Sequence, residues 1–544
     1  MASTKINRIG SWNNFHFNGP FPTKILFDTD TDRNIVSLTD RYNDSAKEIQ
    51  RLIQDSLVNN ERLRAFGSAW SLSNIAHQKD RMLFNARLNI KLPVSNEQLH
   101  AASKFKPEDL FFIQCGTTIK EITEFIFRKN KSLKATGASN GQTIAGAIST
   151  GVHGSAIDVG SIQDCVAGIN LITGPGPNDI VYIERHTQPA MNDDYAKGIN
   201  SRVIRNDDLF NAALVSLGSF GVIHGVLIEA EDRYLLKRYV KKISRDDALE
   251  FARSLDFKNL TAKTEPVIPN ELKADGSGKR PFHYKLYINP YNEKEKFVTE
   301  IMYKKDYRNG YPDPVPSIKK SIFKDLPSWV AIFAAKYKRS IPLILNALAA
   351  QAFPDIDDDI EGTLGEIFWD TTQPGAAFGS GFGIDPKDSA KALGLMINVI
   401  KTKGPVPGIL SMRFVKASLG TLAFTRFPVT CILEIDGVLW EGNQNMISLE
   451  DFLTNVAETF KSNNIKFRLH WGKNGPWAFP GLVEYMYGDA AAQWKNIRCA
   501  LLSKQMADLF SNDFLDTVKL SDYREGVEPG LIASLTIDAG IGTG

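Results

Sequence analysis

The sequence predicts an α+β fold that is divided into more than one domain. Its length of 544 residues exceeds what one compact core usually holds, so two or three domains are expected. Helical and strand-like patterns alternate through the first third of the chain, and strands of period two appear further on. A hydrophobic content of 43% is ordinary for globular proteins and argues against disorder.

The first third of the chain contains the clearest alternation of helix and strand. Apolar residues within 49–57 recur at helical spacing, and Asp44 or Ser45 can cap that helix. Residues 110–114 form an apolar run of strand length, and the threonine pair at 117–118 supplies a cap for the next helix. These elements indicate a sheet with helices rather than a repeat.

Strands with one apolar and one polar face are expected in the second half. Within residues 282–288, His283, Lys285 and Tyr287 alternate with apolar or aromatic neighbours. Residues 429–435 alternate in the same way. Such alternation is typical of antiparallel sheets that pack on a core with one face.

Two apolar stretches of helical character, 330–350 and 389–401, lie between these strands. They predict helices packed on the antiparallel sheet of a second domain. Neither reaches the roughly 18 uninterrupted apolar residues of a membrane span, because a basic cluster at 336–339 divides the first. The N-terminus shows no secretory signal, so a cytoplasmic location is expected.

The charge balance and the cysteines exclude several classes of function. The chain has 64 basic and 62 acidic residues and a net charge of +2, which gives no electrostatic footprint for nucleic acid. The four cysteines show neither a C-x-x-C pair nor metal-ligand spacing, so no metal site is expected and the thiols are predicted to be free and buried.

Three segments, 64–73, 136–155 and 216–223, are rich in glycine and small hydroxyl residues. Such segments cannot fill a dense core layer, but they bring bare backbone N–H groups close to a large ligand and suit a pyrophosphate. None of them follows the P-loop pattern or a strand-linked G-x-G-x-x-G. Ordinary tight turns are the alternative interpretation of each segment.

Short motifs follow one another along the chain at 115–121, 141–147, 149–155, 161–168 and 217–223. Their order resembles the FAD-binding domain of the vanillyl-alcohol oxidase and p-cresol methylhydroxylase superfamily. The resemblance implies a two-subdomain FAD-binding domain of the p-cresol methylhydroxylase type, joined to an α+β substrate domain with an antiparallel sheet.

The C-terminal region extends the resemblance. Residues 469–473 (Leu-His-Trp-Gly-Lys) and 510–515 are similar to the branch of alditol oxidase and the sugar-lactone oxidases, whereas the size of the middle region is closer to flavin-linked cholesterol oxidases. The resemblance implies an FAD-binding domain at 1–232 and a substrate-binding cap at 233–464. A segment at 465–544 then completes the active site and returns to the FAD domain.

The composition and the resemblance together predict the residues that contact FAD. They are Phe66, Gly67, Ser68, Ala69, Trp70, Ser71, Thr136, Gly137, Asn140, Gly141, Gln142, Thr143, Gly146, Ala147, Ser149, Thr150, Gly151, His153, Gly154, Ser155, Gly218, Gly221, Val222 and Ile223.

The first loop departs from its relatives. Many of them have Gly-His-Ser there, and that histidine carries the flavin covalently. The aligned triplet here is Ala69-Trp70-Ser71, so FAD is predicted to bind without a covalent bond at this loop. Cys165 aligns with a non-linking position and is expected to be a buried, inert thiol.

Lys473 and Arg413 are the predicted cations of the active site. Hydride transfer to a flavin leaves negative charge on its ring, and a fixed cation there favours the transition state. Within 409–415, Ser411 and Arg413 project to one strand face, where alcohol-oxidising relatives have Glu-x-Arg. Ser411 therefore replaces the glutamate. Solvated side chains are the alternative for both cations.

The missing glutamate leaves the acceptor of the alcohol proton open. His470 is a candidate because a neutral imidazole titrates near working pH, and Arg468 is expected to share its strand face. A buried structural histidine is the alternative for His470. His153 lies within the second glycine-rich loop and is expected to orient backbone rather than to carry chemistry.

The predicted function is oxidation of the CH–OH group of a small-molecule alcohol by FAD, with oxygen as the expected electron acceptor and hydrogen peroxide as product. A sterol-like substrate is one alternative, with 330–350 lining a hydrophobic entrance. A polyol or sugar lactone, suggested by 469–473, is the other. A dehydrogenase with a different acceptor and a non-redox FAD-binding protein, which Ser411 would suit, remain open. The sequence predicts no oligomeric state.

Overall fold

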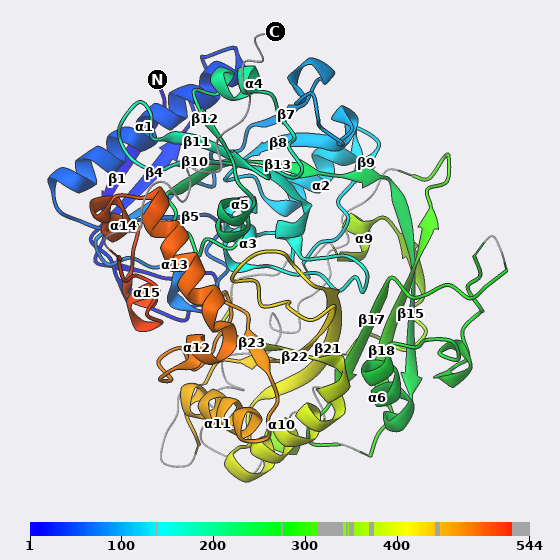
Figure 1. The fold of residues 1–544 in the computed structure, drawn as a ribbon. Coiled ribbons are helices and arrows are strands. Elements are labelled where there is room, and N and C mark those ends of the chain that lie inside the picture. Colours follow the sequence, from blue (N-terminus) through cyan, green and yellow to red (C-terminus); the bar gives the residue numbers. More distant parts are fainter. Residues whose placement is uncertain are drawn as a thin grey trace, which may run out of the picture.

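The computed structural model describes residues 1–137, 139–273, 276–292, 294–312, 341–343, 346, 353–368, 375–440 and 446–524. Most of the 330–350 stretch therefore lies outside the described residues. Figure 1 shows one part in blue to cyan above a second part in green to yellow, with orange helices running along the side of both.

The upper part contains two sheets. The four-stranded sheet has the order β1 (Ser3–Arg8), β4 (Ile25–Asp30), β6 (Arg81–Phe84) and β5 (Leu63–Phe66). The six-stranded sheet has the order β12 (Arg202–Arg205), β11 (Ile180–Glu184), β10 (Val166–Ile172), β13 (Val222–Glu229), β8 (Leu110–Gln114) and β7 (Lys91–Pro93). Strands β10 and β11 are buried along their whole length, as expected for strands covered on both faces.

The lower part is built on one nine-stranded sheet whose strands pair antiparallel. Its order is β16 (Thr264–Glu265), β15 (Tyr234–Ile243), β18 (Phe297–Asp306), β17 (His283–Ile288), β21 (Gly408–Lys416), β22 (Val429–Val438), β20 (Ala377–Ile384) and β23 (Phe467–Leu469), with β19 (Ile360–Gly362) paired to β15. Two short pairs complete the strands, β2 (Ser11–Trp12) with β3 (Phe21–Pro22) and β9 (Lys131–Ser132) with β14 (Glu231–Asp232).

The helices surround these sheets. Those of the upper part are α1 (Leu38–Val58), α2 (Ile119–Phe127), α3 (Ile144–Thr150), α4 (Asp193–Gly198) and α5 (Asp207–Leu214). Those of the lower part are α6 (Arg245–Ser254), α9 (Leu364–Phe368), α10 (Ser389–Lys403) and α11 (Leu449–Ser462). The C-terminal helices are α12 (Leu482–Tyr487), α13 (Asp489–Leu501), α14 (Lys504–Leu509) and α15 (Asp513–Thr517).

One face of the nine-stranded sheet packs on helices, and the other faces the upper part. Helices α6, α10 and α11 lie below the sheet in Figure 1, and α10 contacts β22. The apolar residues Leu410, Met412 and Phe414 of β21 are fully buried in the core. Because side chains alternate along a strand, the residues between them point to the opposite face.

Most element boundaries expected from the sequence are confirmed, and one is wrong. Strand β8 spans Leu110–Gln114, and α2 begins after Thr118, which caps it together with Glu121. Helix α1, however, begins at Leu38 rather than after Asp44 or Ser45. Its cap is Ser37, whose side chain accepts the N–H of Asp40. The first turn of α1 is mostly polar, so the spacing of apolar residues did not reveal where the helix begins.

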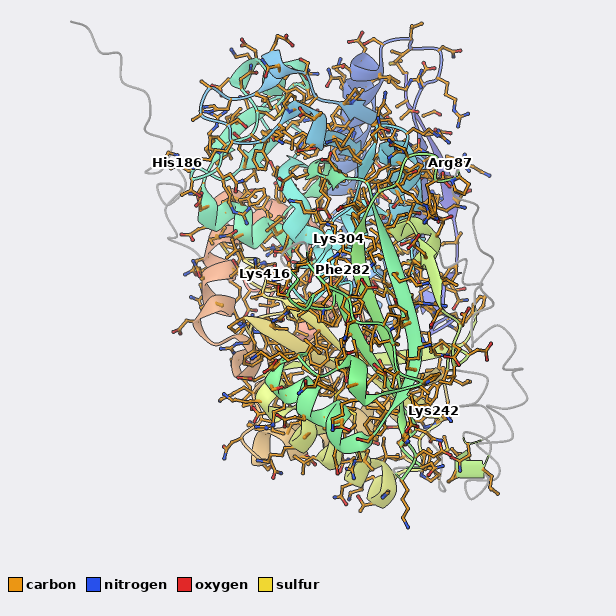
Figure 2. The ribbon with its side chains drawn as sticks, turned by 90° about the vertical axis from the view of Figure 1, so that its right-hand side faces the viewer. Arg87, His186, Lys242, Phe282, Lys304 and Lys416 are labelled. Carbon is orange, nitrogen blue, oxygen red and sulfur yellow. The ribbon has the colours of Figure 1, made fainter. Side chains whose placement is uncertain are left out.

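The two parts are joined by backbone hydrogen bonds. Ile157 N–H donates to the Phe282 carbonyl at 2.9 Å, and Leu72 N–H donates to the Gly472 carbonyl at 2.8 Å. Figure 2 shows Phe282 and Lys304 near the middle of the molecule and Lys242 towards its lower end. Strands β15 and β18 therefore run from this junction to the far end of the lower part.

The C-terminal helices pack back on the upper part. The Trp494 indole N–H of α13 donates to the carbonyls of Ala212 and Val215, at 3.2 and 3.1 Å. Arg62 forms an ion pair with Asp516 at 2.6 Å. Among the helices that the structure describes, none is long and apolar enough to cross a lipid bilayer.

Candidate active site

A cavity of about 980 Å³ lies between the glycine-rich segments of the upper part and the nine-stranded sheet of the lower part. Ligand sites usually measure about 300–1,000 Å³, so this cavity has room for a large cofactor and a small substrate. One wall, the glycine-rich wall, consists of residues from 64–76, 136–155 and 217–223. The opposite wall, the sheet wall, carries charged side chains from β15, β17, β18, β21 and β22.

The glycine-rich wall needs its glycines because its segments touch each other. A Cβ on Gly67 would lie 1.9 Å from Thr143 Oγ1, and one on Gly154 would lie 2.6 Å from the Thr136 carbonyl oxygen. Gly218 and Gly221 have φ angles of 68° and 115°, a region that side chains disfavour. Three segments far apart in the sequence thereby form one continuous backbone surface.

Most of the residues predicted to contact a cofactor lie on this wall. Those that line the cavity are Phe66, Gly67, Ser68, Ala69, Trp70, Ser71, Thr136, Gly137, Gln142, Thr143, Gly146, Ser149, Thr150, His153, Gly154, Ser155, Gly218, Gly221 and Ile223. Five others, Asn140, Gly141, Ala147, Gly151 and Val222, do not appear in the lining.

The residues outside the lining support the wall from behind. The Asn140 side chain donates to the Phe368 carbonyl at 2.8 Å and accepts the Thr136 hydroxyl at 2.7 Å. Gly141 lies under the ring of Trp70, where a Cβ would be 2.6 Å from Cζ2. Gly151 ends α3 with a φ of 73°.

Three buried polar atoms at or next to the glycine-rich wall have no hydrogen-bond partner among the described residues. They are Asn85 Oδ1, Gln142 Oε1 and Ser155 Oγ. Buried polar groups are nearly always satisfied, and an unsatisfied one costs about 1–3 kcal/mol. These atoms therefore point to a polar ligand on the glycine-rich wall.

Trp70 lines the cavity in the segment for which the sequence predicts no covalent bond to FAD. Its ring stacks on Phe15 with centroids 4.1 Å apart, and it contacts His16 edge-on at 5.7 Å. Cys165 is buried, does not line the cavity, and has its pKa raised to about 12 by burial, so its thiol stays protonated.

On the sheet wall, Ser411, Arg413 and Lys473 converge on a residue that the sequence did not single out, Glu434. Arg413 donates to both carboxylate oxygens of Glu434 at 2.6 Å, and Lys473 donates to Oε1 at 2.6 Å. Ser411 Oγ donates to Oε2 at 3.2 Å. Lys473 also contacts Asp436 at 3.1 Å.

The position of Glu434 follows from strand register. Ser411 on β21 lies directly opposite Glu434 on β22, and both side chains reach the cavity. The carboxylate partner of Arg413 therefore comes from the neighbouring strand instead of from position 411. The alternation within 429–435 indicated a polar face, but no pattern in the sequence gives the register between two strands.

The charges of this cluster hold Glu434 as a carboxylate. Burial alone would raise its pKa, but Arg413 and Lys473 hold the pKa of Glu434 well below its usual range. Burial lowers the pKa of Lys473, and Asp436 and Glu434 outweigh that effect and raise it. The cluster is therefore fully ionised although it is buried.

Two neutral histidines lie beside this cluster with opposite tautomers. Burial, together with Lys473, lowers the pKa of His470 to about 3, and burial with Arg413 holds the pKa of His153 well below its usual value. His470 Nδ1 accepts the Gly472 N–H at 3.0 Å, so its proton is on Nε2. His153 Nδ1 donates to the Gly154 carbonyl at 2.8 Å, so its Nε2 has a free lone pair.

His153 and His470 lie close together, but Arg468 does not join them. The two imidazoles have ring centroids 5.4 Å apart, and His153 Nε2 is 3.7 Å from Glu434 Oε1. Strand β23 ends at Leu469, so the expected shared face of Arg468 and His470 is wrong. Arg468 instead donates to the carbonyls of Met486 and Ala423, at 3.0 and 2.6 Å.

A second polar cluster on β15, β17 and β18 lines the same cavity. Its side chains are Arg238, His283, Lys285, Tyr287 and Glu300. His283 Nε2 lies 3.0 Å from Glu300, and Arg238 lies 3.7 Å from it. The polar face of 282–288 predicted from the sequence is therefore the face that borders the cavity.

Comparisons with known proteins agree with this geometry. Residues 42–177 match the FAD binding domain family. A D-arabinono-1,4-lactone oxidase from Candida glabrata is 24% identical over 207 residues, which are 38% of this chain and 34% of that enzyme. The match thus spans about a third of the length of this relative. An L-gulono-1,4-lactone dehydrogenase from Mycobacterium tuberculosis is 21% identical over 438 residues, 79% of this chain and 85% of that enzyme.

Two solved structures share the fold. A cholesterol oxidase from Brevibacterium sterolicum has a TM-score of 0.65 at 13% identity and covers 95% of this chain and 97% of its own. A VAO-type flavoprotein from Myceliophthora thermophila C1 has a TM-score of 0.54 at 12% identity, with 88% and 77% covered. The predicted α+β class is thereby confirmed.

The family match over residues 42–177, the relatives and the shared fold support the resemblance to the vanillyl-alcohol oxidase and p-cresol methylhydroxylase superfamily and indicate an FAD-dependent oxidoreductase. The glycine-rich wall fits FAD, because it joins close backbone surface to unsatisfied polar atoms at Asn85, Gln142 and Ser155. FAD as the cofactor, predicted from the sequence, is confirmed.

Proposed function

We propose that this protein oxidises the CH–OH group of a polar organic substrate with bound FAD. The proposal rests on the ionised cluster of Arg413, Glu434 and Lys473, which lies across the cavity from the glycine-rich wall. Bound FAD supplies the acceptor for a hydride. The protein contributes the fixed charges, the orientation of the hydroxyl and the acceptor for its proton.

The charges of the sheet wall favour a hydroxylated substrate over a sterol. An apolar ring system against Glu434, Lys285 and Arg238 would remove water from charged groups without replacing its hydrogen bonds, which is costly. A polyol or sugar-like molecule offers donors and acceptors instead. The names of the lactone oxidase and lactone dehydrogenase relatives agree with this choice, whereas that of the cholesterol oxidase does not.

Glu434 is suited to orient the hydroxyl rather than to remove its proton. Its carboxylate already accepts hydrogen bonds from Arg413, Lys473 and Ser411, which occupy the lone pairs that would take up a proton. His470 is excluded as the acceptor in its neutral form, because its Nδ1 lone pair is used by the Gly472 N–H. It can donate a hydrogen bond from Nε2.

His153 is the proposed proton acceptor. Its Nε2 lone pair is free, and Glu434 Oε1 at 3.7 Å would stabilise the imidazolium that forms. The expected effect of His153→Ala is a fall of about 10²–10⁴-fold in the rate at which substrate bleaches the flavin, with FAD retained. If His153 only orients the cofactor loop, the variant would instead lose FAD and keep its rate per bound flavin.

The proposed reaction class is tested by anaerobic mixing of the yellow protein with a panel of polyols, sugar acids and sterols. Bleaching by a hydroxylated substrate supports CH–OH oxidation. Recolouring in air then indicates oxygen as the acceptor and peroxide as the product, whereas a persistent loss of colour indicates a dehydrogenase with another acceptor. Failure of every alcohol to bleach a protein that retains FAD would contradict the proposal and favour a non-redox flavoprotein.

We also propose that FAD is bound without a covalent bond at Trp70, because an indole stacked on Phe15 offers no nucleophile. Acid precipitation of the holoenzyme is expected to leave the yellow colour in the supernatant. Colour that stays with the denatured pellet would contradict this.

A further inference from the structure

Lys285 of β17 projects into the cavity from the polar face of its strand. Its neighbours Tyr284 and Leu286 point the other way and are fully buried in the core. Lys285 lies opposite Arg413 on one adjacent strand and opposite Glu300 on the other. It is therefore in the middle of the sheet wall, between the two polar clusters.

The other cations of the cavity wall have partners. Arg413 and Lys473 share Glu434. Arg238 forms an ion pair with Asp358 and lies 3.7 Å from Glu300. Arg64 donates to backbone carbonyls, including that of Gly218 at 3.0 Å.

Lys285 differs from them. Among the described residues, none offers its ammonium a carboxylate within ion-pair distance or a hydrogen-bond acceptor, and its contact is with the face of the Tyr287 ring at 4.2 Å. The nearby carboxylates are occupied, since Glu300 contacts His283 at 3.0 Å and Glu434 is held by Arg413 and Lys473.

A half-buried ammonium that faces a cavity without a counterion among the described residues is unfavourable unless a ligand supplies one. Partial burial, reinforced by the charge of Arg413, lowers the pKa of Lys285 to about 8. The side chain is therefore still mostly charged at neutral pH. An anionic group brought in by a ligand would find a partly desolvated cation without a counterion, and a charge-assisted hydrogen bond to it would be stronger than a neutral one.

We propose that Lys285 binds a carboxylate of the substrate, so that the substrate is a polyhydroxylated acid of sugar size. This inference rests on the proposed CH–OH oxidation and names its substrate class. The strand order supports the size: β17 and β22 are separated by β21, so Lys285 and Glu434 start from backbones about 10 Å apart. A hydroxyl at Glu434 and a carboxylate at Lys285 therefore belong to opposite ends of one molecule.

The binding test uses the FAD-loaded protein and two probes without an oxidisable hydroxyl. Hexanoate carries one carboxylate at the end of a six-carbon chain, and hexanamide is its neutral counterpart. Titration followed by the flavin absorption spectrum should give hexanoate about 10- to 100-fold tighter binding than hexanamide. Lys285→Met should remove this preference, and Lys285→Arg should keep most of it.

A matched control comes from the same sheet. Lys242 on β15 is exposed, and Figure 2 shows it towards the lower end of the molecule. Lys242→Met is expected to leave the hexanoate preference unchanged. Equal affinity for hexanoate and hexanamide in the unmodified protein, or an unchanged preference in Lys285→Met, would overturn the inference. If Lys285→Met does not fold, the comparison in the unmodified protein and in Lys285→Arg decides.

The turnover test separates this inference from the proposed function. Gluconate and sorbitol differ at one end, where a carboxylate replaces a hydroxymethyl group. Gluconate should bleach the flavin with the higher kcat/KM, and the ratio should fall about 10- to 100-fold in Lys285→Met. Equal bleaching by both would overturn the role of Lys285 and leave CH–OH oxidation standing. A preference for hexanoate without bleaching by any alcohol would support the carboxylate site and contradict the oxidation.

Discussion

Glu434 receives hydrogen bonds from Ser411, Arg413 and Lys473, and it is buried beside neutral His153. A buried ion pair contributes little net stability, because desolvation of the charges offsets their attraction. Removal of one member, however, leaves the remaining charges buried without a counterion. The charge balance of the sheet wall therefore depends on this one side chain more than on the number of ion pairs around it.

The Glu434→Gln variant is expected to be less stable by about 3–5 kcal/mol, because Arg413 and Lys473 lose the charge that compensates them. Its rate of flavin bleaching should fall as well, since the hydroxyl exchanges a charged acceptor for a neutral, weaker one. Urea unfolding and anaerobic stopped-flow measure the two effects. Ser411→Ala removes only a 3.2 Å neutral donor and should cost about 0.5–1.5 kcal/mol. Equal losses in both variants would contradict the central role of Glu434.

The pH dependence of kcat/KM should follow Lys285 rather than a histidine. The pKa of His470 is about 3 and that of His153 lies well below its usual value, both through burial, so both rings are neutral at neutral pH. The pKa of Lys285 is about 8 through burial and Arg413, so its charge is present below pH 8 and is lost as pH rises through that value. For an acidic substrate, kcat/KM should be flat around neutral pH and fall above pH 8.

The charged and titratable groups that face Lys285 act together with burial on its pKa. They are Arg413 on β21, Glu300 on β18, Glu434 and Asp436 on β22, and Tyr287 on its own strand. Lys285→Arg should move the falling limb to higher pH. A rising limb near pH 6.5 would instead show that a histidine must lose its proton.

At the scale of elements, structure was predictable from the sequence where local rules decide it. The cap at Thr118 and the strand at Leu110–Gln114 were predictable, because capping and apolar run length are local. The start of α1 at Leu38 was not, since its first turn is exposed and carries no apolar period. The division of the chain at residues 232 and 464 stays a prediction.

The candidate site likewise has features that local sequence predicts and features that depend on long-range packing. The glycine-rich segments were predictable, because few structures other than a close backbone approach need so many small residues. Glu434 was not, since its meeting with Arg413 depends on the pairing of β21 with β22. The tautomers of His153 and His470 depend on Gly154 and Gly472 in three dimensions, so no sequence pattern distinguishes the donor from the acceptor.

The contact between two loops makes Gly67 a testable position. Gly67→Ala would place a Cβ 1.9 Å from Thr143 Oγ1, so the segments 64–73 and 136–155 must separate. FAD affinity is expected to fall by tenfold or more, corresponding to about 1.4 kcal/mol or more. Gly10→Ala is the matched control, because nothing lies within 4 Å of its Cβ. Fluorescence of released flavin gives both affinities, and unchanged binding in Gly67→Ala would contradict this packing.

At the scale of the whole molecule, the C-terminal helices hold the third glycine-rich segment in place. Arg498 of α13 is buried and donates to the Ser219 carbonyl at 3.0 Å and to Ser511 Oγ at 3.0 Å. Arg64 donates to the carbonyls of Leu217 and Gly218 from the other side. The glycine-rich wall is thus supported by a contact between residues more than 270 positions apart in the chain.

Arg498→Met is expected to lower the free energy of unfolding by about 3 kcal/mol, because the carbonyl of Ser219 and the hydroxyl of Ser511 lose a charged donor. Since Gly218 and Gly221 flank that carbonyl, FAD should also bind more weakly, although Arg498 does not line the cavity. Urea unfolding with and without added FAD measures both effects. Excess FAD should restore part of the loss, by about 2.7 kcal/mol at 100 times its Kd.

Arg253→Met, at an exposed arginine paired with Glu250, is the control and should change stability by less than about 1 kcal/mol and leave FAD binding intact. A less stable Arg498→Met protein with unaltered FAD affinity would show that α13 stabilises the fold without supporting the glycine-rich wall.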